Sequence, residues 1–132
     1  MSHIPPSSWP QGQLDSLNTE VLSLLEELRN YIRDHQAADF QTLDVSARIA
    51  LSRIRSALTL QLTSMAGWVL FHQAQAAGED LPEAATAGEI ASVVEGCDAA
   101  LLAAMPEAFR AILNRADALF RRLSALDGGA SA

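Results

Sequence analysis

The sequence predicts an all-α protein, a three-helix bundle with a long central helix and a partly helical crossover before the last helix. Apolar residues make up 49% of the 132 residues and aromatic residues only 5%, so the core must consist mainly of Leu, Ala, Ile and Val. Leu and Ala favour helices, and β-branched runs bounded by turns, which are typical of strands, are absent. In three long segments the apolar residues recur at steps of three and four.

The central segment runs from Val45 to Ala77, and no charged residue occurs between Arg55 and Glu79. Its main apolar stripe consists of Leu51, Ile54, Leu58, Leu62, Met65, Val69, His72 and Ala76. Leu60, Trp68 and Phe71 lie off that stripe. A helix that is apolar on more than one side must be covered on more than one side. We therefore expect at least two neighbouring helices to pack on it.

The uncharged run is also long enough to span a bilayer. Polar residues such as Thr59, Gln61 and Gln73 interrupt it, however, and its densest apolar part, Met65 to Phe71, is too short to cross. A buried helix of a soluble protein is therefore the better interpretation, and no membrane span is predicted.

The remaining chain divides into a leader, one domain and a tail. Residues 1–13 are rich in Pro and Ser and are expected to be flexible, residues 14–127 form a single helical-bundle domain, and residues 128–132 form a flexible tail. The leader does not have the pattern of a signal peptide, which favours a cytoplasmic protein. The single Cys97 excludes an internal disulfide.

We expect the first helix over residues 14–33, followed by a connection over residues 34–42. Thr42 or Asp44 should start the central helix. Gly78, which directly follows it, is suited to a left-handed cap.

The segment from Gly78 to Met105 contains Pro82, Gly88 and Gly96, which favours a long crossover. Residues 89–95 and 98–104 could each be short helical pieces. The last helix should begin at Pro106, a residue suited to the first helical position, and end at Asp127, Gly128 and Gly129.

The net charge of −7 disfavours nucleic-acid binding, which depends on contacts to phosphates. All nine basic residues are Arg, which excludes lysine nucleophiles. Between Arg55 and Arg110 there are seven acids and no further Arg. Three of these acids, Glu79, Asp80 and Glu83, are candidates for a surface that receives an Arg-rich partner. The alternative is a solvated loop that its acids keep soluble.

No catalytic, cofactor-binding or metal-binding constellation occurs in the sequence. The three His residues are far apart, and Cys97 has no partner that would activate its thiol. We therefore expect no enzyme and no cofactor, with His72 as a core histidine. The alternative is an enzyme or a small-ligand carrier with a pocket between the helices near His72 and Trp68.

The central helix carries more apolar surface than two neighbours can readily cover. Trp68 and Phe71 are therefore candidates for a homodimer interface, where Trp is enriched. The alternative is a monomer in which the crossover folds over this surface.

Two segments together resemble a known family. The first is MAGWVL at residues 65–70, followed by Gln73 and AGE at 77–79; the second is MPEAF at 105–109, followed by LFRRL at 119–123 and LD at 126–127. Their order and spacing resemble the RcdA family, the regulators of CtrA degradation of alphaproteobacteria. The resemblance implies a homodimeric all-α bundle without catalytic activity. It also implies an adaptor that helps the ClpXP protease receive a cell-cycle transcription regulator.

Overall fold

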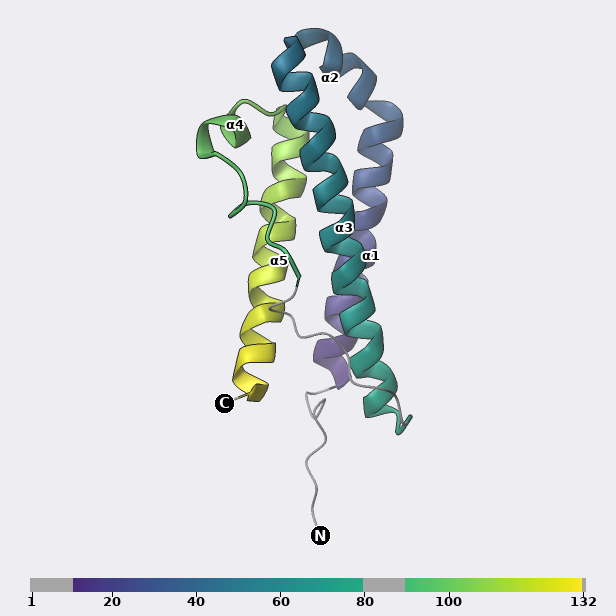
Figure 1. Ribbon diagram of the computed structural model, residues 1–132. Coiled ribbons are helices and arrows are strands. Elements are labelled where there is room, and N and C mark those ends of the chain that lie inside the picture. Colours follow the sequence, from purple (N-terminus) through teal and green to yellow (C-terminus); the bar gives the residue numbers. More distant parts are fainter. Residues whose placement is uncertain (1–10, 80–89, 132) are drawn as a thin grey trace.

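The computed structural model describes residues 11–79 and 90–131 (Figure 1). The described residues form helices and no strands: α1 (Gln11–Asp34), α2 (Gln36–Thr42), α3 (Val45–Ala76), α4 (Ala99–Ala103) and α5 (Glu107–Ser131). Figure 1 shows the three long helices side by side, with α2 connecting α1 to α3 at one end and α4 beside that same end. The predicted all-α fold, with three long helices and a partly helical crossover, is confirmed.

The core lies between α1, α3 and α5, each of which packs against the other two. Residues that recur at steps of three and four along each helix are almost completely buried, because such spacing keeps them on one face. Fully buried members are Leu14, Leu17 and Val21 of α1, Leu58, Leu62 and Met65 of α3, and Phe109 and Leu123 of α5. Burial of these side chains is the main force that holds the three helices together.

Helix α2 forms where the sequence predicted only a connection. Three contacts hold this short helix to its neighbours: Tyr31 Oη donates to Asp39 Oδ2 at 2.6 Å, Arg48 Nε donates to the Phe40 carbonyl at 2.6 Å, and Arg55 Nη1 donates to Gln36 Oε1 at 3.0 Å. Each of these contacts joins α2 to α1 or α3. Tertiary contacts of this kind stabilise a helix too short to persist alone.

Both ends of α3 form as the sequence predicted. Asp44 is the N-cap, and its side chain accepts a hydrogen bond from the Ala47 N–H at 2.8 Å. At the other end Gly78 adopts a positive φ of 92°. The N–H groups of Gly78 and Glu79 donate to the carbonyls of Gln75 and Ala74, the two hydrogen bonds of a Schellman motif.

The crossover is less helical than predicted. Asp98 caps α4 by accepting a hydrogen bond from the Ala100 N–H, so the expected helical piece at residues 98–104 is present. The expected helical piece at residues 89–95 is wrong for residues 90–95, which are not helical and contain a turn that begins at residue 93. In this segment Ser92 Oγ accepts from the Glu95 N–H, and side-chain bonds of this type compete with a helix.

Helix α5 begins directly after Pro106 and continues to Ser131. The prediction that it ends at Asp127, Gly128 and Gly129 was therefore wrong. A glycine lowers helix propensity by about 1 kcal/mol relative to Ala, which disfavours a helix without forbidding it. Arg115 and Arg122 of α5 form ion pairs with Glu27 and Glu20 of α1 on the bundle surface.

Candidate partner-binding surfaces

The outer face of α3 is uncharged and leaves two large apolar side chains exposed. Leu60 and Leu70 retain 67% and 56% of their accessible surface. They lie on the face opposite the buried stripe, because each helical residue turns the chain by about 100°. Gly67 lies between them on this face, and a side chain placed there would meet nothing within 4 Å. This exposed apolar face is a candidate association surface.

Of the two residues predicted for the dimer interface, Trp68 lies on the buried side of α3, whereas Phe71 lies about 20° from Leu60 around the helix axis. Trp68 is only 4% exposed within the single chain, and Phe71 is half-buried. The ring of His72, itself buried, lies 4.3 Å from the Trp68 ring centroid and 5.4 Å from that of Phe71. The dimer remains a prediction. Trp68 is mostly buried within its own chain, whereas Leu60 and Leu70 are exposed and are available for contact with a second copy.

A groove runs along α3 beside the segment that precedes α4. It consists of two adjoining pockets of about 470 and 290 Å³, which share Ala57, Gly96 and Cys97 in their linings. Neither pocket is lined by Trp68 or His72, the residues near which the sequence placed an alternative ligand pocket. Sequence reasoning missed this groove, because its second wall is a non-helical stretch whose path no periodicity indicates.

The predicted acidic surface begins at the end of α3. Glu79 is exposed, and its N–H completes the cap of that helix. Asp80 and Glu83 lie outside the described residues. The carboxylate of Glu79 therefore faces solvent next to a rigid helix end, a position from which it can contact a partner.

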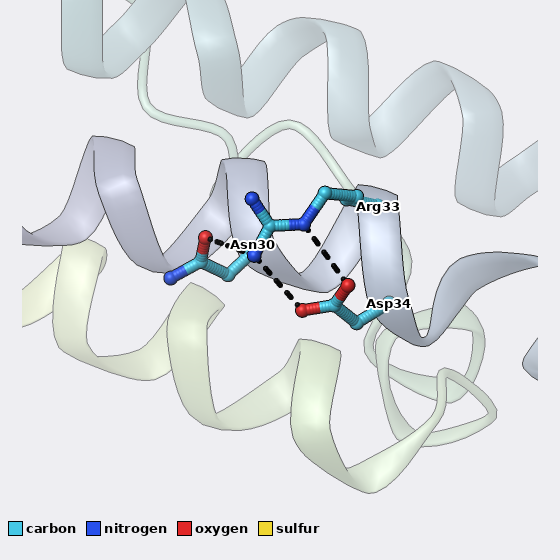
Figure 2. A network of polar contacts seen from close by, with 3 residues as sticks. All are labelled: Asn30, Arg33 and Asp34. Carbon is cyan, nitrogen blue, oxygen red and sulfur yellow. Dashed lines mark hydrogen bonds and ion pairs between the residues drawn. The ribbon is translucent and has the colours of Figure 1, made fainter.

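A small polar network occupies the end of α1 (Figure 2). Arg33 donates to both carboxylate oxygens of Asp34, at 3.0 and 3.1 Å, and to Asn30 Oδ1 at 3.1 Å. The hydrogen bonds from Arg33 lower the pKa of Asp34, and the same bonds raise the pKa of Arg33. These side chains are exposed, so the network contributes little to stability and is a feature of the solvated surface.

The fold strongly raises the pKa of the buried phenol of Tyr31. Tyr31 is 2% exposed and lies 5.4 Å from the Phe109 ring, measured between centroids. Burial is the main cause that raises its pKa, and the hydrogen bond to Asp39 raises it further. Because the pKa moves away from neutrality, this phenol is protonated at physiological pH.

Within residues 11–79 and 90–131, no three His, Cys, Asp or Glu side chains are grouped closely enough to hold a metal ion. Among the described helices, none is both long enough and apolar enough to cross a membrane.

Comparison with known proteins places the chain in a family. The family model described as "Protein of unknown function (DUF1465)" matches residues 7–131. The chain belongs to this family. The DUF1465 chain is also similar to a solved structure, the crystal structure of RcdA from Caulobacter crescentus CB15, with a TM-score of 0.66 and 29% identity over 86% of this chain and 87% of that one.

The structural match confirms the resemblance to RcdA that the sequence motifs indicated. It extends over all three long helices of the DUF1465 fold rather than over a local motif. A comparison with curated proteins gave no significant match.

Proposed function

We propose that this protein is a non-enzymatic adaptor, which helps deliver a cell-cycle transcription regulator to the ClpXP protease in the cytoplasm. The observation that carries the proposal is the similarity to RcdA, which covers 86% of the chain at a TM-score of 0.66. A similarity of this extent supports a related binding role. The function of a fold still depends on its surfaces, and these must therefore be tested one by one.

The acidic segment that starts at Glu79 is the first of these surfaces. Glu79 is exposed, and the sequence places Asp80 and Glu83 next along the chain with no base between Arg55 and Arg110. We expect these carboxylates to attract an Arg-rich partner surface, since opposite potentials speed the encounter of two proteins.

The second surface is the outer face of α3, through which we expect two copies of the chain to associate. The uncharged outer face of α3 around Leu60 and Leu70 would be covered in a two-fold dimer, in which the same patch of both chains meets. Phe71, which is half-buried, lies on the same helix and would extend that contact.

Affinity capture from native cytoplasm tests the adaptor function. The tagged wild-type chain is expected to retain ClpX or the transcription regulator, detected by mass spectrometry. A variant with Glu79→Gln, Asp80→Asn and Glu83→Gln should lose much of this capture while its melting temperature stays nearly unchanged.

The matched control neutralises three acids elsewhere, with Glu26→Gln, Glu107→Gln and Asp127→Asn, which changes the net charge by the same amount without touching the segment after α3. Equal loss of capture with this control would show that only overall charge matters. Failure of the wild-type chain to retain either the protease or a regulator contradicts the proposed delivery function.

A further inference from the structure

Residues 90–97, which precede α4, lie beside α3 without forming a helix (Figure 1). Val93 in this stretch is only 6% exposed, and Ile90 and Cys97 are partly buried against the hydrophobic core. We call residues 90–97 the cover, because they lie over one side of α3. Three apolar side chains therefore attach the cover to the bundle.

The backbone of the cover makes its hydrogen bonds within the cover itself. The Cys97 N–H donates to the Val94 carbonyl, and the Glu95 N–H donates to Ser92 Oγ, each at 3.3 Å. Within residues 11–79 and 90–131, no hydrogen bond or ion pair joins the cover to α3 or α5. The attachment therefore depends on apolar burial, which is not directional.

The contact between the cover and α3 is loosely packed. Pockets of about 470 and 290 Å³ lie between them, and Gly96 and Cys97 line both. A well-packed interior has few voids larger than a water molecule, so the cover is not packed as the core is. Segments with few buried apolar contacts and an exposed backbone open at a lower free energy than the whole fold.

A polar side chain of α3 lies where the cover meets that helix. Gln61 is 4% exposed and lines the smaller pocket together with Val93. Exposure of an amide to water is favourable, whereas exposure of a leucine in its place would be unfavourable. The surface of α3 next to the cover is therefore chemically suited to being uncovered.

We propose that the cover opens as one unit while α1, α3 and α5 stay packed, so that the folded protein has a closed and an open form. Opening uncovers Gln61 and Ser64 next to Leu60, which is already exposed, and so enlarges the accessible outer face of α3. The cover thereby sets how much of α3 is accessible, and this does not require the core to unfold.

Thiol labelling under native conditions tests the proposal, because Cys97 is the single Cys of the chain and can be replaced. In a Cys97→Ser background, Val93→Cys places a thiol at the buried position of the cover. Val21→Cys is the matched control, since it makes the same exchange at a fully buried position of α1. Each variant is incubated with iodoacetamide, and the labelled fraction is followed by mass spectrometry.

We expect labelling of Val93→Cys to be at least a hundredfold faster than that of Val21→Cys, roughly, because opening of the cover costs less than global unfolding. Urea should accelerate labelling steeply at Val21→Cys and weakly at Val93→Cys, since the slope follows the area exposed. Equal rates and equal urea slopes overturn the proposal. Labelling of Val93→Cys as fast as in the unfolded chain overturns the closed form.

A core substitution separates local from global opening. Leu28→Ala, at an almost completely buried position of α1, should accelerate labelling of Val21→Cys by more than about thirtyfold. Labelling of Val93→Cys should change less than about twofold, because Leu28 stays buried in the open form. Equal acceleration at both positions would show that the cover leaves only when the bundle unfolds, and the proposal fails.

Gln61→Leu tests whether opening uncovers α3. The apolar side chain favours burial, so labelling of Val93→Cys should slow about fivefold. The same factor is expected for Val21→Cys, because residue 61 is exposed in both the open and the unfolded chain. Slowing of Val21→Cys alone would mean that Gln61 stays covered when the cover moves, and would contradict the surface assigned.

The unsubstituted chain gives a second probe that does not depend on the folding of Val93→Cys. Labelling of the native Cys97 should show the same weak dependence on urea and should be nearly unaffected by Leu28→Ala. A urea slope as steep as that of Val21→Cys overturns the proposal. Circular dichroism of each variant checks that the helices are retained.

Discussion

Alkaline pH should unfold this protein through a single side chain. Tyr31 is the only Tyr, and all basic residues are Arg, so no Lys titrates in the same range. The fold raises the pKa of Tyr31 through burial and through its hydrogen bond to Asp39 at 2.6 Å. The folded chain therefore keeps the phenolic proton at a pH where the unfolded chain, with an ordinary pKa of about 10, has lost it.

The sign and size follow from proton linkage. The contribution of Tyr31 to stability is fully present below about pH 10, since neither state is then ionised. Above that pH, unfolding releases one proton, and the free energy of unfolding falls by about 1.4 kcal/mol for each pH unit. Against a typical total of about 5–15 kcal/mol, a rise of two units removes a large part of the stability.

Two signals followed in one alkaline titration check this prediction. Tyrosinate absorbance in the ultraviolet reports ionisation of Tyr31, and circular dichroism reports helix content. We expect the two transitions to coincide, because the phenol ionises only when the bundle opens. Urea unfolding at several pH values should give the expected slope.

The matched variant is Tyr31→Phe, which keeps the ring against Phe109 and removes the hydroxyl. It should lose about 1–2 kcal/mol at neutral pH, the value of a hydrogen bond to a charged and partly solvated acceptor, and should lack the alkaline slope. Tyrosinate absorbance that rises near pH 10 while the helices remain intact would refute the reasoning. The same slope in Tyr31→Phe would refute it as well.

Three further predictions concern packing, capping and association. Phe109→Ala, at a fully buried position, should cost about 3–5 kcal/mol in urea unfolding, and a loss below about 1 kcal/mol would mean that the core collapses around the gap. Asp44→Ala should cost about 1 kcal/mol in the same assay, because the Ala47 N–H loses its acceptor; no change would assign the start of α3 to another group. Leu70→Asp should convert a dimer into a folded monomer in sedimentation, and a wild-type chain that is monomeric at high micromolar concentration rejects the dimer.

The sequence predicted the helices whose packing is periodic and missed those that depend on distant contacts. Leu51, Leu58 and Met65 follow a spacing that indicates one buried face, and the structure buries all three. Local chemistry also predicted the ends of α3, since an Asp cap and a left-handed Gly act within one turn. Helix α2 was missed, because contacts such as Arg55 with Gln36 join residues far apart in the chain.

For the candidate surfaces too, the sequence predicted what depends on local composition and missed what depends on distant contacts. An excess of apolar surface on α3 could be predicted from composition, but which residues remain exposed depends on the positions of α1 and α5. Trp68 is covered within its own chain, and Leu60 is exposed. The groove beside Gln61 could not be predicted, since it depends on the path of the turns at residues 90–97.

The lifetime of the transcription regulator in living cells tests the proposed adaptor function most directly. Synthesis is stopped in cells with and without the gene for this protein, and the regulator is followed by immunoblot at the stage when ClpXP normally removes it. The account predicts a several-fold longer half-life without the gene and recovery when the wild-type chain is restored. An unchanged half-life, with the protein shown to be present in the wild-type cells, would contradict it.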